Sequence, residues 1–273
     1  MLCHKDKANL ALCLDRVAKR FATRAGEEYT AVEDISIEVS AGRFVSVVGP
    51  SGCGKSTLLN MAAGLTAPSS GAVIVYGEPL RGINQRSGYM FQQDALLPWK
   101  TVLDNVILGL LFRGGIRREA VELGMEWLAR VGLKDFALAY PYELSGGMRK
   151  RVGMAQNWIV DPDILLMDEP FSALDIHTRQ RMEGELLQLW SGSRKSVLFV
   201  THDLEEAIAL SDEVVVLSAG PASRVVQRYP VDLDRPRNLL DLRTQPAFID
   251  IYRRIWADLK QEVLRSHEQF EIA

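Results

Sequence analysis

A glycine-rich stretch at positions 49–56 carries the clearest chemistry in this 273-residue chain. Its order, Gly-Pro-Ser-Gly-Cys-Gly-Lys-Ser, matches the pattern G-x-x-x-x-G-K-[ST]. Glycines let backbone amides turn inward around phosphate oxygens, and a following helix adds its positive N-terminal end. We predict a nucleotide phosphate loop in which Lys55 reaches the terminal phosphates and Ser56 holds magnesium. The residues assigned to this loop are Gly49, Pro50, Ser51, Gly52, Cys53, Gly54, Lys55, Ser56 and Thr57.

Cys53 inside the loop has two interpretations. It is either a small buried filler or a thiol beside an anion-binding helix end, which favours the thiolate. In the second case, alkylation of Cys53 should block nucleotide binding and bound nucleotide should protect the thiol.

Two adjacent carboxylates, Asp168 and Glu169, follow an apolar run. Neighbouring side chains of a strand point to opposite faces, so the two groups need not share a role. We assign Asp168 to magnesium and Glu169 to the general base, a role worth typically about 10²–10⁴-fold in rate. The alternative is a strand-end helix cap.

His202 follows a third apolar run. A lone histidine is more often structural, but this one is expected at the same sheet edge as the residues above. We predict that its imidazole bonds the terminal phosphate and senses whether that phosphate is present.

A second glycine motif, Ser145, Gly146 and Gly147, precedes a helical run. Ser145 is a good helix N-cap, and the two glycines make the helix start accessible to an anion. The motif has no lysine or magnesium carboxylate of its own, so it resembles half of a binding site. A plain glycine-capped helix is the alternative.

Three short apolar runs must position these residues: Phe44–Val48, 164–167 and 197–200. Such runs suit strands buried on both faces of a parallel sheet. The carboxyl ends of parallel strands share one edge, where open α/β sheets bind ligands. We therefore predict an α/β fold in which the three strands end at one common site.

Helical patterns fill the remaining chain. We predict helices over 56–63 and 177–190, an amphipathic C-terminal helix beginning near Pro246, and a helical insertion within 93–157. The expected division is a nucleotide-binding core of 1–91 and 160–235, a helical subdomain of 92–159, and a C-terminal extension of 236–273.

Composition narrows the class of protein. The net charge of −3 lacks the basic balance of a nucleic-acid binder, and we interpret the run 149–151 as a solvated helix face. Three cysteines without metal-ligand spacing fit a reducing, cytosolic setting. Residues 1–7 lack a signal-peptide pattern, and no apolar run approaches the roughly 18 residues of a membrane span. If the protein works at a membrane, we expect another chain to cross it.

Together these motifs resemble the ATP-binding cassette (ABC) ATPases over about residues 12–259. Leu-Ser-Gly-Gly-Met at 144–148 is similar to the signature motif of that family, and Met-Asp-Glu-Pro at 167–170 to its magnesium and base motif. Ser-Ala-Leu-Asp at 172–175 looks like the dimer-contact loop that ends in Asp175. Gln92 matches the glutamine linking nucleotide to the membrane partner, and Phe21 the aromatic that stacks on adenine, although Phe21 could equally be a core aromatic.

The resemblance implies an ATPase that uses ATP and Mg²⁺. It implies a P-loop NTPase core with a mostly parallel sheet, an antiparallel β subdomain and a helical insertion. It also places Gln92 among the catalytic residues and, with Ser56 and Asp168, around the metal. A head-to-tail homodimer would close each signature motif over ATP held by the other subunit.

Further motifs, at 96–99, 168–171, 197–209 and 229–233, resemble the ATPases of nitrate, sulfonate, taurine and bicarbonate importers. This implies transmembrane permease subunits, a periplasmic or lipoprotein solute-binding protein, and a peripheral location on the cytoplasmic side of the inner membrane. Departures at 156–158, Lys150, Ser172 and 221–224 leave the solute open. The alternatives are a non-transport ABC ATPase, an importer ATPase for another solute, and a catalytically idle cassette.

Overall fold

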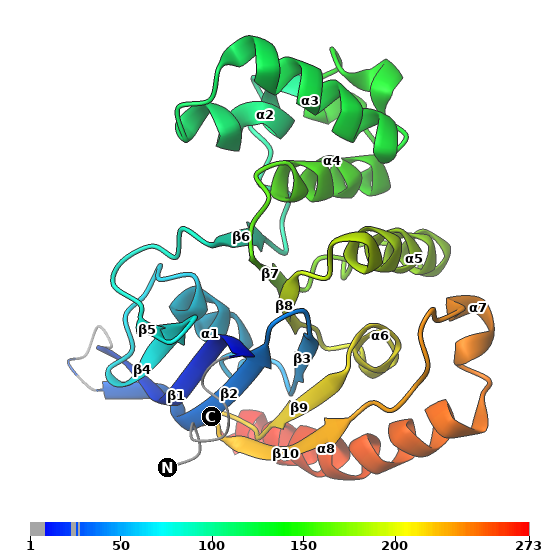
Figure 1. The fold of residues 1–273 in the computed structure, drawn as a ribbon. Helices are drawn as coiled ribbons and strands as arrows, with labels where there is room; N and C mark the ends of the chain where they lie inside the picture. The colour runs from blue at the N-terminus through cyan, green and yellow to red at the C-terminus, as the bar shows by residue number, and fades with distance from the viewer. Residues whose placement is uncertain (1–8, 23–25, 27, 273) are drawn as a thin grey trace.

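The structure, a computed structural model, describes residues 9–22, 26 and 28–272 (Figure 1). Two sheets and a separate group of helices form the α/β molecule. The predicted mostly parallel sheet, antiparallel sheet and helical insertion are all present.

The larger sheet has six strands in the order β10-β9-β3-β8-β7-β6. Strands β6 to β9 and β3 run parallel, and β10 pairs antiparallel with β9. Every residue of β3, β7 and β8 is buried, as the unbroken apolar runs predicted. The bounds are β3 Phe44–Val48, β6 Ser87–Met90, β7 Ile164–Asp168, β8 Ser196–Val200, β9 Glu213–Leu217 and β10 Val225–Pro230.

The smaller sheet is antiparallel, with strand order β2-β1-β4-β5. The second half of β2 alternates buried and partly exposed positions, the pattern of a sheet covered on one face, whereas β1 contains a continuous buried run over 11–14. The bounds are β1 Leu10–Ala22, β2 Glu28–Ser40, β4 Ser70–Val75 and β5 Glu78–Pro79.

Helices flank the sheets and form a separate layer at the top of Figure 1. That upper layer has its own apolar core, which includes Val102, Val106, Leu128 and Val152. Its members are α2 Val102–Phe112, α3 Arg117–Arg130, η2 Lys134–Phe136, η3 Pro141–Glu143 and α4 Gly146–Trp158. Beside the six-stranded sheet lie α1 Lys55–Ala62, α5 Ile176–Ser193 and α6 Leu204–Leu210.

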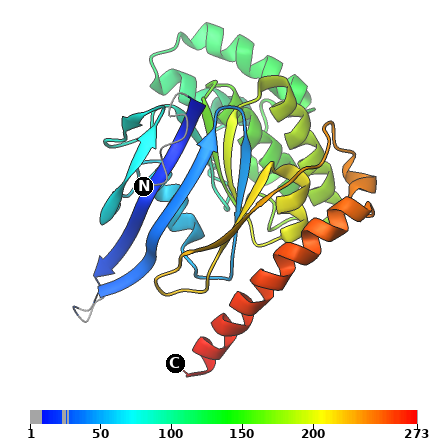
Figure 2. The same cartoon turned by 60° about the horizontal axis from the view of Figure 1, so that its bottom comes forward.

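The C-terminal segment runs back along the six-stranded sheet. After α7, Leu239–Leu242, the long helix α8, Pro246–Ile272, packs on α6, β9 and β10 (Figure 2). Pro246 is its first residue, as expected. Phe248, Ile251, Ile255 and Leu259 are buried, which confirms the apolar face predicted from their spacing.

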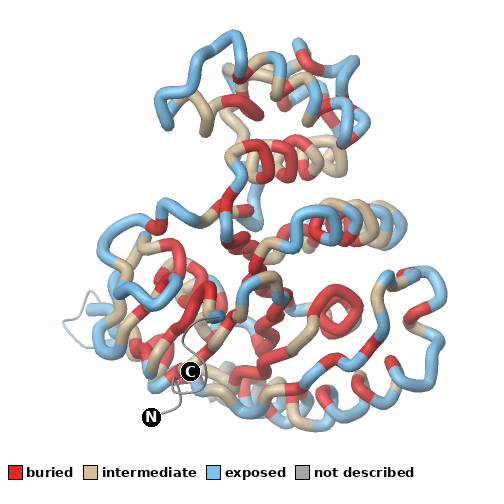
Figure 3. Tube along the Cα trace, in the orientation of Figure 1, coloured by how far each residue is buried: buried red, intermediate tan, exposed pale blue. Residues whose placement is uncertain are grey.

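Buried residues concentrate in the strands and on the inner faces of the helices (Figure 3). One apolar cluster lies on the α5, α6 and α8 side of the six-stranded sheet, and a second lies between this sheet and the antiparallel one. Because β3, β7 and β8 are held between these clusters, the loops at their carboxyl ends start from rigid positions.

Candidate nucleotide site

The loop after β3 has a backbone that needs glycine at two positions. Gly54 has φ +88°, and a Cβ there would lie 2.4 Å from Val32 Cγ1. A Cβ on Gly49 would lie 2.7 Å from Cys53 Sγ. A side chain at either position would push the loop open, so the close turn depends on glycine.

Lys55 is buried and folded into this loop. Its Nζ donates to the carbonyl oxygens of Gly49 and Pro50 at 2.9 and 3.1 Å. The charge of this ammonium acts on both Asp168 and Glu169: it opposes the rise that burial causes in the pKa of Asp168, and it contributes to the lowered pKa of Glu169. The phosphate loop and the Asp168–Glu169 pair therefore lie side by side, as their positions after β3 and β7 predicted.

Asp168 ends β7 beside Ser56. Burial raises the pKa of this carboxyl, while a hydrogen bond from Ser56 partly offsets that effect. Oδ1 of Asp168 is buried and has no hydrogen-bond partner among the described residues. A buried carboxylate oxygen is costly to leave without a partner, and Mg²⁺ usually binds one or two carboxylates together with substrate phosphates. The donor set of Asp168 and Ser56 fits this ion.

Glu169 lies one residue beyond β7, so the strand alternation that we used to predict diverging carboxylates does not apply to it. β7 ends at Asp168, and Glu169 adopts φ +42°. The two carboxylates do diverge, but the cause is this left-handed backbone turn rather than the alternation of a strand. Its backbone N–H still donates to Val200 O at 2.8 Å, so the turn is held to β8.

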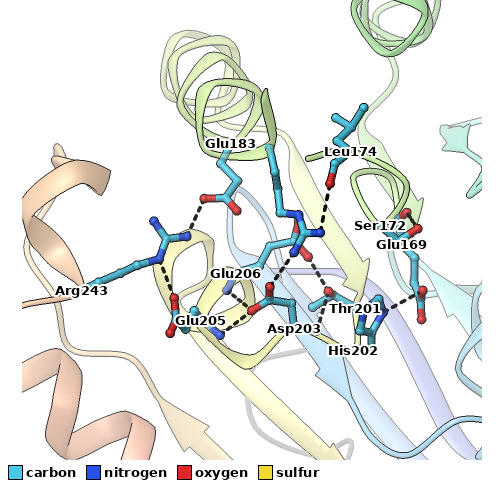
Figure 4. A network of polar contacts seen from close by, with 11 residues as sticks. Glu169, Ser172, Leu174, Glu183, Thr201, His202, Asp203, Glu205, Glu206 and Arg243 are labelled. Carbon is cyan, nitrogen blue, oxygen red and sulfur yellow. Dashed lines mark hydrogen bonds and ion pairs between the residues drawn. The ribbon is translucent and has the colours of Figure 1, made fainter. Parts of the chain in front are cut away.

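One oxygen of the Glu169 carboxylate is contacted by two side chains from distant segments, His202 and Gln92. His202 Nδ1 lies 2.9 Å from Glu169 Oε2 (Figure 4), and Gln92 Nε2 donates to the same oxygen at 3.3 Å. The His202 contact lowers the pKa of Glu169 and raises the pKa of His202, against the effect of burial on each. The pair therefore favours an ionised carboxylate beside an imidazolium.

The second glycine motif lies elsewhere. Ser145 caps α4 as predicted, accepting a hydrogen bond from Met148 N at 3.3 Å. The helix start packs on the α5 region, where a Cβ on Gly147 would lie 2.9 Å from Thr178 Cγ2. α4 is apart from α1 and its phosphate loop (Figure 1). Within one chain, Ser145, Gly146 and Gly147 are therefore not part of the cluster around Lys55.

Two other predicted contact residues lie at the surface. Phe21, on β1, is 41% exposed, so it is not the core aromatic that was the alternative interpretation. Asp175 caps α5 by accepting from Thr178 N at 3.0 Å.

The thiolate hypothesis for Cys53 is wrong. Cys53 is fully buried, and burial raises the pKa of its thiol despite the nearby Lys55 ammonium. Desolvation outweighs the charge of the helix start here, so Cys53 is the small buried filler of the first interpretation.

The basic run 149–151 is also not a solvated face. Lys150 is buried, and its Nζ contacts Gln92 O at 2.7 Å and Asp94 Oδ1 at 3.0 Å. Arg149 pairs with the same Asp94 at 2.8 Å. Helix α4 is thereby tied to the segment that carries Gln92.

Sequence reasoning missed the residues that brace the site. Ser223 Oγ donates to Cys53 O at 2.5 Å across 170 positions, which holds the phosphate loop from behind. Asp203, next to His202, accepts from Arg179 at 2.9 Å. Neither pair has a local spacing signal, because each joins segments that only the fold brings together.

Comparison with known proteins agrees with this geometry. Residues 32–172 match the family model described as ABC transporter. The chain is 44% identical to the taurine import ATP-binding protein TauB of Rhizobium johnstonii over 93% of this chain and 99% of that one. It is 39% identical to the nitrate import ATP-binding protein NrtC of Synechococcus elongatus, over 92% of this chain and 38% of that one.

Among solved structures, a dimeric post-hydrolysis state of the ATP-binding cassette MJ0796 bound to ADP and Pi is similar. The TM-score is 0.72 with 31% identity, over 82% of this chain and all of that chain. The fold and site define a P-loop ATPase. The chain belongs to the ABC transporter family, and it is an ABC-type ATPase that binds and hydrolyses ATP.

Two features are absent from the residues that the structure describes. No helix among them could span a membrane, since each is too short or too polar. No group of three or more His, Cys, Asp or Glu side chains among them is arranged to hold a metal ion. Phosphate and water oxygens usually complete the coordination of a magnesium ion that a protein holds through one or two carboxylates.

Proposed function

We propose that this chain is the ATPase subunit of an importer, coupling ATP binding and hydrolysis to uptake of a small anionic solute of the nitrate, sulfonate, taurine or bicarbonate type. The observation that carries the catalytic part is the 2.9 Å contact between Glu169 and His202 beside Lys55. Relatives named as taurine and nitrate import proteins support the solute class.

The residues have separate roles in this proposal. Lys55 binds the β- and γ-phosphates after leaving the loop carbonyls, and the backbone amides of 49–57 surround the phosphates. Ser56, Asp168 and Gln92 hold Mg²⁺, which neutralises phosphate charge when bound. Glu169 takes a proton from the attacking water. His202 contacts the γ-phosphate, and Phe21 stacks on adenine.

A second copy of the chain completes the site. The start of α4, which carries Ser145, Gly146 and Gly147, lies away from the phosphate loop of its own chain, and the similar MJ0796 cassette forms a dimer. We infer a head-to-tail homodimer in which these residues, with Asp175, meet ATP bound by the other copy. The proposed division into 1–91 with 160–235, 92–159 and 236–273 lets the signature-bearing part close over that ATP.

In this function the chain acts at the cytoplasmic side of the inner membrane, attached to permease subunits and served by a solute-binding protein. The test is to isolate the membrane and solute-binding subunits that co-purify with the chain and reconstitute them in liposomes. We expect ATP-dependent uptake of one solute of the proposed class, lost with Glu169→Gln.

Gln92→Ala should lower uptake more than it lowers ATP affinity, because Gln92 is proposed to link the nucleotide to the permease. A chain that carries no membrane subunit when it is isolated from its own membranes would contradict the importer function and favour the alternative, a non-transport ABC ATPase. Uptake of an unrelated solute would retain the importer but overturn the solute class.

A further inference from the structure

Arg179 lies in the first turns of α5 and joins two loops of the site. Its Nη1 donates to Asp203 Oδ2 at 2.9 Å, and its Nη2 donates to Leu174 O at 3.2 Å. Its side chain is 23% exposed, so it is mostly enclosed by these partners. Figure 4 shows Leu174 and Asp203 in the polar network that reaches Glu169 and His202.

The Leu174 side of Arg179 leads to Glu169 through a tight turn. Ser172 donates twice to Glu169 O, from its backbone N at 3.3 Å and its Oγ at 3.0 Å. Leu174 N donates to Phe171 O at 3.1 Å. The position of the Leu174 carbonyl is therefore fixed relative to the left-handed backbone of Glu169.

The Asp203 side leads to the same carboxylate through His202. Asp203 Oδ1 accepts from the backbone N–H groups of Glu205 and Glu206 at 2.9 and 3.2 Å, which caps α6. Its other oxygen, Oδ2, is left for Arg179. Since His202 precedes Asp203 directly, the cap and the ion pair together fix the backbone that carries the imidazole.

Four hydrogen bonds join Glu169 to His202, Arg179 to Asp203, Arg179 to Leu174, and Ser172 to Glu169. The chain itself connects His202 to Asp203 and Ser172 to Leu174, so bonds and chain together close a ring. We propose that Arg179 is a positioning residue for ATP hydrolysis: it holds the turn after Glu169 and the segment carrying His202 in one arrangement, so that the carboxylate and imidazole stay aligned. The inference rests on the roles proposed above for Glu169 and His202.

The guanidinium shape matters for this role. Arginine presents several N–H donors in a rigid fork, whereas lysine is a single point charge on a flexible stem. Arg179→Lys can keep the ion pair with Asp203 but cannot hold both acceptors in the same geometry. Arg243 also pairs with two carboxylates, Glu183 at 2.8 Å and Glu205 at 2.9 Å. Neither of these partners belongs to the loops that carry Glu169 and His202, so Arg243 does not have the positioning role proposed for Arg179.

The test is steady-state ATP hydrolysis by the purified full-length chain. Arg179→Ala should lower kcat about tenfold, the effect of losing a charge-assisted hydrogen bond, with the KM for ATP changed by less than about twofold. Arg179→Lys should recover part of the loss. Asp203→Asn keeps an oxygen for the α6 cap but loses the anion. The double variant Arg179→Ala/Asp203→Asn should be no slower than the slower single variant, because both remove one contact.

Arg181→Ala is the matched control, since Arg181 is 71% exposed on the same helix and pairs only at 3.5 Å with Glu185. It should hydrolyse ATP at the parental rate. The inference is overturned if Arg179→Ala matches this control, if the loss is in KM, or if the two single effects multiply in the double variant. If Arg179→Ala does not fold, the variants Arg179→Lys and Asp203→Asn test the positioning role instead. A parental kcat in both of them would overturn that role. Parental turnover by Glu169→Gln would instead reject the proposed base, a separate failure.

Discussion

At the scale of single residues, Glu169 and His202 set each other's charge. Their hydrogen bond is the largest influence on both groups, lowering the pKa of the carboxyl and raising that of the imidazole. At neutral pH the carboxylate is therefore ionised and able to accept a proton, which a general base requires.

Replacing Glu169 with Gln should remove that acceptor while keeping the shape of the side chain. We expect kcat for ATP hydrolysis to fall by about 10²–10⁴-fold. ATP binding, measured by titration, should persist because Lys55 and the loop amides are unchanged. The control is Glu122→Gln, which changes a carboxylate that is 65% exposed on α3 and should leave kcat unchanged. Parental turnover in Glu169→Gln would exclude the base role.

Cys53 should behave as a buried thiol. Because it is fully buried and its pKa is raised, we expect negligible alkylation of Cys53 in the folded chain and full alkylation in urea, read by peptide mass mapping. Rapid alkylation of the native protein that ATP suppresses would contradict the burial and restore the thiolate hypothesis.

At the scale of elements, α6 carries a buried acid. Burial raises the pKa of Glu206 to about 8, with Glu183 and Asp203 adding to the rise and Thr201 and Arg179 opposing it. The side chain therefore stays protonated in the fold at neutral pH, within hydrogen-bonding reach of Thr201.

The raised pKa of Glu206 makes the free energy of unfolding depend on pH. Between the unfolded value of 4.5 and about 8, the unfolded chain releases a proton that the folded chain retains, so the free energy of unfolding falls as pH rises. Glu206→Gln removes this group. Its melting temperature relative to the parent should increase from pH 5 to 8 and level off above. A difference independent of pH would contradict the buried, protonated state.

Helix α8 supports the phosphate loop indirectly. Buried Glu262 accepts from Ala219 N at 2.9 Å, and the same loop carries Ser223, which holds Cys53 O. Glu262→Ala leaves that N–H without its partner, so we expect a loss of about 1–3 kcal/mol in the free energy of unfolding by urea. Exposed Glu268→Ala, on the same helix, should change it by less than about 0.5 kcal/mol. Equal effects would show that the Ala219 contact is not stabilising.

The elements differ in how well sequence alone predicted them. β3, β7, β8 and the apolar face of α8 follow from local patterns, and Ser145 as an N-cap follows from residue type. The left-handed Glu169, the buried Lys150 and the Arg179–Asp203 pair do not, because each depends on partners brought in from distant segments. Burial, which decided the state of Cys53, is likewise a property of the packed fold.

At the scale of the whole molecule, the residues that we propose to bind ATP fall into two separate groups within one chain. Lys55, Asp168, Glu169 and His202 gather at the carboxyl ends of β3, β7 and β8, while the α4 start lies apart (Figure 1). The proposed head-to-tail dimer makes these two groups complementary, and ATP is the ligand that would join them.

The most direct test is the mass of the Glu169→Gln chain in solution, measured by light scattering with and without Mg²⁺ and ATP. We expect a monomer without nucleotide and, with Mg²⁺ and ATP, a dimer that holds one ATP per copy. Adding Lys55→Ala to the same chain should return the monomer. A Glu169→Gln chain that stays monomeric with ATP bound would contradict the nucleotide-joined dimer, and one that hydrolyses ATP at the parental rate would contradict the base role of Glu169.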